Sequence, residues 1–192
     1  MYRFALLGLL LIAIKTQGLA QENTRNWYSE STTNGVTIQN SYPKGGHYTH
    51  DVAGKYYTSY LVFYSRVVNK SDSTLNFSVN FSADSIPIPN SPGTYMRLLL
   101  PAKEMTEQNQ DLFSYGLTEL DLSDKPGDFQ KTLAPQEDCL FYVVAFFYQT
   151  NTGEWNQERG GNRAGLVLKG DELFYHMPPQ VEMLRCGKVT FD

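Results

Sequence analysis

The hydrophobic pattern of the chain centres on a ten-residue apolar stretch from Cys139 to Tyr148. The stretch is rich in β-branched and aromatic residues, has no polar stripe and is short for a helix, so it suits a buried strand. Both of its faces would be apolar in an extended conformation. The pattern therefore predicts the central strand of a β-sandwich, hidden from water on each side by neighbouring sheets.

Two segments upstream also have the pattern of strands. Lys55 to Val68 carries apolar and aromatic residues on both parities. Leu75 to Phe81 alternates strictly between apolar and polar residues, which indicates one buried and one solvated face. Because the polar residues Asn69 to Ser73 turn the chain between them, we predict that the two segments form a hairpin.

Turn residues divide the rest of the chain into short extended segments. Asn34-Gly35 precedes a strand, and Gly170-Asp171 joins two strands in a hairpin. The prolines of Ile86-Pro87-Ile88-Pro89 cannot donate a normal ladder of hydrogen bonds, which predicts an edge or crossover segment. Further strands are expected at 36–39, 94–100, 112–120, 165–169, 172–176, 181–186 and 188–191, and residues 131–133 are expected to extend towards Pro135.

These elements give eight to ten strands and no long amphipathic helix. Residues 40–54 are expected to form a polar loop, and 104–111 to contain one helical turn. The predicted fold is therefore all-β, a single antiparallel β-sandwich.

The first twenty residues have the features of a signal peptide. Arg3 supplies a positive charge, Phe4 to Ile14 is an apolar run of eleven residues, and Gly18-Leu19-Ala20 places small residues before a cleavage point at Gln21. Eleven apolar residues are too few to span a bilayer. We expect a secreted, periplasmic or extracellular protein with a flexible arm at 21–33 and the sandwich domain at 34–192.

The charge of the chain disfavours two classes of partner. The formal net charge is −4, and it becomes −6 once Arg3 and Lys15 are removed with the signal peptide. Nucleic acid and anionic membranes would on average be repelled by such a surface. Nothing in the sequence calls for a cofactor.

The two cysteines, Cys139 and Cys186, predict a disulfide in an exported protein. On the chain-entropy view, closing this loop would stabilise the fold by roughly 4 kcal/mol. Two buried free thiols are the alternative. A catalytic cysteine is disfavoured because no His lies near either residue in the sequence.

Aromatic and basic residues in two regions are candidate ligand contacts. Six tyrosines fall between Tyr42 and Tyr64, close to His47, and could stack on sugar rings or grip an extended peptide. The alternative is that these rings cover the core, because strand parity places them on both faces. A long loop after the central strand adds a second group of candidates. The candidate contact residues are Tyr42, His47, Tyr48, Trp155, Arg159 and Arg163.

Two groups of residues could hold a metal ion. His47, His50 and Asp51 offer ligands suited to zinc or copper. A second group of carboxylates could supply oxygen ligands to calcium, although the spacing does not match an EF-hand loop. Solvated loops are the favoured interpretation of both groups. The carboxylates are Glu119, Asp121, Asp124 and Asp128.

Motifs for modification and catalysis are few. Asn69, Asn76 and Asn80 each begin an Asn-x-Ser sequon. The sequence lacks a Gly-x-Ser-x-Gly elbow, a phosphate-binding loop and a His-Glu-x-x-His pair. The paired carboxylates of a glycosidase need only spatial proximity, so sequence spacing does not decide their presence.

Several segments resemble secreted proteins with an Ig-like fold. They are Arg66 to Ser71, Leu75 to Phe77, Pro135 to Tyr142 and Arg163 to Gly170. The combination of an Asn-rich turn with a Pro-x-Glu lead-in is similar to exported Ig-like sandwiches, and the segment from Arg163 to Gly170 resembles one that recurs in secreted proteins of Bacteroidetes-type bacteria. The resemblance implies an Ig-like sandwich over most of the mature chain and brings no catalytic motif and no activity with it.

The sequence thus favours an exported, non-enzymatic sandwich that binds or scaffolds, with aromatic-rich loops contacting a protein or a carbohydrate. The alternative is a secreted hydrolase with a loop-borne site of Asp, Glu and His, where carboxylates with raised pKa converge in a cleft. A small outer-membrane β-barrel is less favoured, because the stretch at 140–148 offers no polar face to a lumen.

Overall fold

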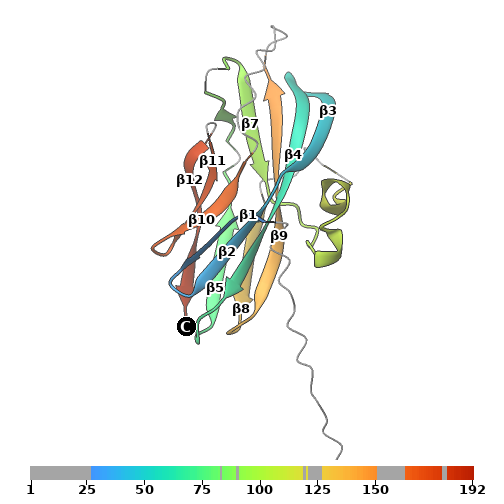
Figure 1. Cartoon of the computed structure of the whole chain (residues 1–192). Helices are drawn as coiled ribbons and strands as arrows, with labels where there is room; N and C mark the ends of the chain where they lie inside the picture. The colour runs from blue at the N-terminus through green and yellow to red at the C-terminus, as the bar shows by residue number, and fades with distance from the viewer. Residues whose placement is uncertain are drawn as a thin grey trace, which may run out of the picture.

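Two antiparallel β-sheets packed face to face form the protein (Figure 1). The computed structural model describes residues 27–82, 84–89, 91–118, 120, 127–150, 163–178 and 181–192. The predicted all-β sandwich is confirmed, with twelve strands among these residues rather than eight to ten. The predicted signal peptide at 1–20 lies outside the described residues. No helix in the described part of the chain is long and apolar enough to cross a membrane.

The larger sheet, which we call sheet A, has seven strands in the order β1-β2-β4-β9-β7-β6, with β3 beside β4. Strands β2 and β3 follow one another along the same edge of β4, where they pair with 65–69 and 55–62. The strands are β1 (Trp27–Thr33), β2 (Val36–Ser41), β3 (Lys44–Val52), β4 (Lys55–Asn69), β6 (Ile86–Pro87), β7 (Thr94–Leu99) and β9 (Asp138–Gln149).

The smaller sheet, sheet B, has five strands in the order β10-β11-β12-β5-β8. The hairpin predicted across Gly170-Asp171 is confirmed by the pairing of β10 with β11. The two short strands expected at the C-terminus are one continuous strand. The strands are β5 (Leu75–Asn80), β8 (Asp128–Leu133), β10 (Gly165–Lys169), β11 (Glu172–Met177) and β12 (Val181–Phe191).

Strand β9 lies in the middle of sheet A, between β4 and β7, as the apolar stretch predicts. Phe141, Val143 and Ala145 point into the core between the sheets. Val144 and Phe146 point to the other face, where they join a second buried cluster. Both faces of β9 are therefore buried, but only one of them is covered by a sheet.

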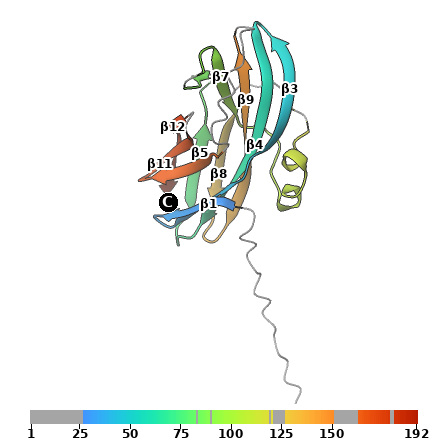
Figure 2. The ribbon, with the colours of Figure 1, turned by 45° about the horizontal axis from the view of Figure 1, so that its top comes forward.

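The outer face of sheet A is covered by the segment between β7 and β8. Residues 101–118 of this segment, which we call the strap, contain two 3-10 turns, η2 (Glu107–Asn109) and η3 (Phe113–Gly116). Figure 2 shows the strap beside sheet A on the side away from sheet B. The strand predicted at 112–120 is therefore wrong. Ser114 and Tyr115 have φ of 45° and 54°, and two consecutive left-handed residues interrupt an extended strand.

The predicted hairpin of residues 55–68 and 75–81 is also wrong, because β4 belongs to sheet A and β5 to sheet B. Asn69 holds the crossing between them. Its Nδ2 donates to the carbonyl oxygens of Ser73 at 2.8 Å and of Leu133 at 3.1 Å, and its Oδ1 accepts from the backbone N–H of Ser71 at 3.0 Å. Two strands joined by a turn can pair in one sheet as a hairpin or lie in two packed sheets as an arch. The alternation of apolar and polar residues is the same in both cases, so the pattern does not distinguish a hairpin from an arch.

Two polar segments expected to be irregular are strands. Residues 27–33 of the predicted arm form β1, joined to β2 by Asn34-Gly35, both with positive φ. Within the predicted loop at 40–54, β3 pairs with β4 across Ala53-Gly54, also with positive φ. Tight turns of this kind bring strands into register without an apolar pattern.

Candidate binding surface

The outer face of sheet A carries a cluster of buried aromatic side chains. It includes most of the tyrosines noted in the sequence, so the interpretation that these rings cover a core applies to them. Tyr42 and Tyr56 are the exceptions, since both are exposed. The buried rings of the cluster are Tyr57, Tyr60, Tyr64, Tyr115, Tyr142, Phe146 and Tyr148.

Tyrosine hydroxyls fix the strap to this face. The hydroxyls of Tyr60 and Ser114 are hydrogen-bonded at 3.0 Å. Tyr142 donates to the carbonyl oxygen of Tyr115 at 2.7 Å, and Tyr115 donates to that of Tyr42 at 2.5 Å. These bonds satisfy buried polar groups and hold the left-handed turn of the strap in one place.

Two lysines donate to backbone carbonyl oxygens of the strap, Lys44 from the start of β3 and Lys103 from within the strap itself. The ammonium of Lys44 donates to the carbonyl oxygens of Gln110 at 2.6 Å and Leu112 at 3.0 Å, and lies 4.3 Å from the centre of the Tyr115 ring. Lys103 donates to the carbonyl oxygen of Gly116 at 2.7 Å. Charged donors make stronger bonds than neutral ones, so these contacts stiffen the strap.

Burial also sets the protonation of this network. Desolvation raises the pKa of the Tyr64, Tyr115 and Tyr142 hydroxyls above the ordinary value. At neutral pH these groups therefore stay protonated, and Tyr115 and Tyr142 act as hydrogen-bond donors. Their role in this network is structural.

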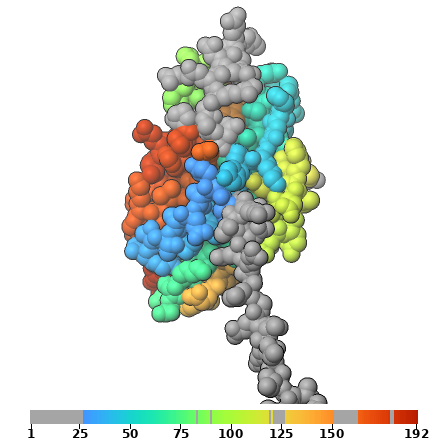
Figure 3. Space-filling model, viewed as in Figure 1, coloured from blue at the N-terminus to red at the C-terminus, as the bar shows by residue number. Residues whose placement is uncertain are grey.

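An exposed apolar patch lies on top of the strap, beside the start of β3. It consists of Tyr42, Leu112 and Phe113, whose exposed fractions are 50%, 49% and 72%. A Cβ placed on Gly46 would lie 3.9 Å from the tip of the Phe113 ring, so the patch borders β3 directly. Figure 3 shows the strap, β3 and the β1–β2 hairpin on the same face of the molecule.

Two of the predicted contact residues come together at the rim of the patch. The rings of Tyr28 and Tyr42 meet edge to face at 5.9 Å. The guanidinium of Arg163 lies 5.5 Å from the centre of the Tyr28 ring. Tyr28 thus links Tyr42 to Arg163. Trp155 and Arg159 lie outside the described residues.

The remaining predicted contact residues are on β3. His47 is exposed, and the ring of Tyr48 packs against Phe146 at 5.3 Å and His50 at 5.8 Å. No cluster of three metal-ligating side chains exists in the described part of the chain, so His47, His50 and Asp51 are not gathered as a set of metal ligands. His50 and Asp51 are consecutive in a strand, and their side chains point to opposite faces.

Of the candidate calcium ligands, the structure describes Asp128 alone. It lies in β8 and accepts a hydrogen bond from the Gln130 amide at 2.8 Å. Glu119, Asp121 and Asp124 lie outside the described residues.

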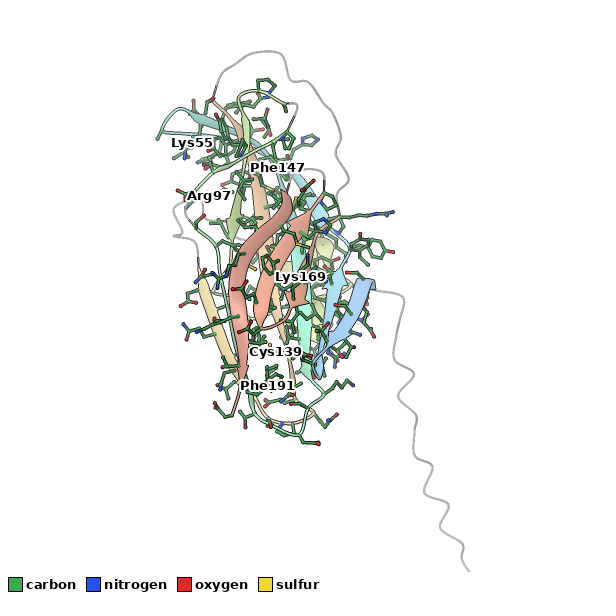
Figure 4. The ribbon with its side chains drawn as sticks, turned by 90° about the vertical axis from the view of Figure 1, so that its left-hand side faces the viewer. Lys55, Arg97, Cys139, Phe147, Lys169 and Phe191 are labelled. Atoms are coloured by element: carbon green, nitrogen blue, oxygen red, sulfur yellow. The ribbon has the colours of Figure 1, made fainter. Side chains whose placement is uncertain are left out.

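Cys139 and Cys186 are free thiols, so the predicted disulfide is wrong. Cys139 lies near the same end of the sandwich as Phe191 (Figure 4). Cys186 is five residues earlier in β12, roughly 16 Å along the strand at the usual rise, whereas a disulfide needs Cα atoms within about 7 Å. Its thiol contacts the carbonyl oxygen of Leu173 at 3.5 Å.

The three sequons differ in accessibility. Asn69 is completely buried in the arch, so the structure leaves no room for a glycan there. The Asn76 side chain bonds Asp192 at 2.7 Å and Thr132 at 2.6 Å. Asn80 is exposed at the end of β5.

A shallow pocket of about 300 Å³ lies on the outer face of sheet B. The described residues that line it include no Asp, Glu or His, so it does not supply the site that a hydrolase of the predicted kind requires. The lining residues are Asn76, Phe77, Ser78, Gln130, Lys131, Thr132, Lys188 and Thr190.

Comparison with known proteins gives no match: no family model, no curated protein and no solved structure is similar to the chain. The resemblance to secreted Ig-like proteins therefore stays a prediction.

Leu112 and Phe113 were missed by the sequence interpretation because they fell in a segment assigned to a strand. Two adjacent large apolar residues between a polar run and Gly116 were the available signal.

Proposed function

We propose that the protein is a secreted, non-enzymatic binding module that contacts a partner protein through the apolar patch of Tyr42, Leu112 and Phe113. The exposure of Phe113, at 72%, carries this proposal. Single exposed apolar residues are common, but adjoining ones such as Leu112 and Phe113 on a well-packed support are typical of an interaction surface.

The support of the patch favours tight binding. The backbone of the patch is fixed by hydrogen bonds. The carbonyl oxygen of Leu112 accepts one from Lys44, and the carbonyl oxygen of Tyr42 accepts one from the Tyr115 hydroxyl. Little conformational entropy would be lost from this backbone on association. Pre-organisation of that kind increases affinity without additional contacts.

The composition of the patch favours protein over carbohydrate. Phe and Leu have no hydrogen-bonding groups, whereas a sugar needs polar partners around the ring on which it stacks. Aromatic anchors in an apolar centre are typical of protein interfaces.

A peptide library and a glycan array test the proposal together. A phage-displayed library of random peptides would be panned on the mature chain, and affinities compared for Phe113→Ser and the control Met183→Ala, an exposed apolar residue of β12. Selected peptides should lose about thirty-fold in affinity with Phe113→Ser, the ~2 kcal/mol of an interface anchor, and nothing with the control. The proposal would be contradicted if the selected peptides bound Phe113→Ser with unchanged affinity. It would also be contradicted if the chain bound glycans on the array and no peptide.

A further inference from the structure

The strap contains a strained stretch of backbone. Ser114, Tyr115 and Gly116 have φ of 45°, 54° and 73°, so three consecutive residues lie in the left-handed region. Single glycines adopt this conformation routinely, whereas it disfavours each other residue by roughly tenfold. Ser114 and Tyr115 are also buried. Strain of this kind persists only where the surrounding structure imposes it, and it is found most often at functional sites and in switch regions.

The strap is attached to sheet A through side chains. The hydroxyls of Tyr60, Tyr115 and Tyr142 and the ammonium of Lys44 make the attachments described above. Backbone N–H groups of the strap donate instead to carbonyl oxygens of the strap itself, namely those of Asn109, Gln110, Leu112, Tyr115 and Leu117. Separation of the strap from the sheet therefore breaks no bond of the β-ladder, which favours local opening.

The face beneath the strap is aromatic. Tyr115 meets the ring of Tyr64 edge to face at 4.7 Å, and Met105 and Leu117 are buried in the same cluster. The other two large apolar side chains of the strap belong to the exposed patch. The strap thus buries three large side chains, far fewer than the core between the sheets, so unfolding the strap alone costs less than unfolding the sandwich.

We propose that the strap is a strained latch that opens as one unit while both sheets stay folded, and that its opening uncovers the aromatic face of sheet A. Opening frees the three left-handed residues to adopt ordinary backbone conformations, which favours release. The latch also controls the apolar patch, because Leu112 and Phe113 lie on the strap. This inference goes beyond the proposed function and holds whether or not the patch binds a partner.

Amide hydrogen exchange of the mature chain, followed residue by residue by NMR, tests the latch. The amides of Leu112, Tyr115 and Leu117 report on the strap, and that of Val144 in β9 reports on the sandwich. The three strap amides should share one opening equilibrium constant, at least about a hundredfold larger than that of Val144. Its urea dependence should be smaller than that of global unfolding, because opening the strap exposes less surface.

A pair of glycine variants tests the role of strain. Gly116→Ala adds a third non-glycine residue to the left-handed turn and places a Cβ 3.0 Å from the Leu112 side chain, so strap opening should increase about tenfold. Gly54→Ala is the matched control, because Gly54 has φ of 75° in the β3–β4 turn and no atom within 4 Å of the Cβ position. It should leave exchange in the strap unchanged.

A pair of tyrosine variants tests the attachment. Tyr60→Phe keeps the ring and leaves the buried Ser114 hydroxyl without this partner, so strap opening should again increase about tenfold. Tyr175→Phe is the control, because the Tyr175 hydroxyl lies in the core between the sheets and has no hydrogen-bond partner in the described part of the chain. This substitution should leave exchange in the strap unchanged.

Three results would overturn the latch. Strap amides that exchange with the same opening constant as Val144 would show that the strap opens only when the whole protein unfolds. Different constants for the three strap amides would show independent fraying instead of one unit. Equal increases in the strap and at Val144 with Gly116→Ala would show that the turn stabilises the whole fold. None of these measurements uses a ligand, so a failed peptide selection would contradict the proposed function and leave the latch standing.

Discussion

The side chain of Asn40 in sheet A pairs with the backbone of Leu166 in sheet B as a second peptide group would. Its Oδ1 accepts from the Leu166 N–H at 2.8 Å, and its Nδ2 donates to the Leu166 carbonyl oxygen at 3.1 Å. Ser65 and Ser29 complete its hydrogen bonds at 2.8 Å and 3.1 Å. One buried amide thus joins the second strand of sheet A to the edge strand of sheet B, and Gly165 allows the approach because a Cβ there would collide with Asn40.

Asn40→Ala should lower the free energy of unfolding by about 3 kcal/mol, because it leaves the backbone groups of Leu166 buried without partners. Urea denaturation measures the change. Asn80→Ala is the matched control, since Asn80 is exposed, and it should alter stability by about 0.5 kcal/mol or less. Equal effects of the two substitutions would show that the Asn40–Leu166 link between the sheets contributes nothing to the free energy of unfolding.

The two tight turns of sheet A offer a matched pair of substitutions. Ala53 has φ of 50°, a left-handed conformation that costs an alanine about 1 kcal/mol, and Asn34 has nearly the same conformation at 51°. Ala53→Asn should stabilise the protein by about 1 kcal/mol, and Asn34→Ala should destabilise it by a similar amount. Thermal unfolding of both variants checks this, and a loss of stability in Ala53→Asn would contradict it.

The thiols should be unreactive in the folded protein. Burial raises the pKa of both Cys139 and Cys186 to about 12, so neither forms the reactive thiolate near neutral pH. A thiol-specific chromogenic reagent should react slowly with the native chain and rapidly with two thiols per chain in urea without reductant. Absence of titratable thiols in urea would indicate a disulfide.

Stability should fall in alkaline solution. The pKa values of Cys139 and Cys186 are raised by burial from 9.0 to about 12, so the unfolded chain loses these protons first. Their contribution is therefore complete below about pH 9 and is lost as pH rises towards 12, at about 1.4 kcal/mol per pH unit for each thiol. The buried tyrosines add to the loss in the same direction, since burial raises the pKa of Tyr115, Tyr142 and Tyr175. Urea denaturation from about pH 7 to about pH 11 tests this, and a flat profile would contradict it.

The parts of the fold that the sequence predicts are those with a strong local signal. The apolar run of β9, the alternation of β5 and the Gly170-Asp171 turn each determine their own conformation from neighbouring residues. The same signals say nothing about which sheet receives a strand. That choice between a hairpin and an arch depends on Asn69, whose partners include Leu133, 64 residues away in the sequence.

The candidate surface was predicted only in part for a similar reason. Tyr42 and Arg163 were identified by residue type, but their connection through Tyr28 requires strands that come together only in the folded protein. Phe113 is exposed because Ser114 and Tyr115 adopt a left-handed turn held by distant tyrosines. No local pattern encodes these contacts.

Hydrogen–deuterium exchange of the mature chain with and without the selected peptide locates the contact most directly. Protection should appear in β3 and in the strap around η3, and it should disappear with Phe113→Ser. Protection confined to β5, β8 and β12, or none at all, would place the binding surface elsewhere and contradict the role of Tyr42, Leu112 and Phe113.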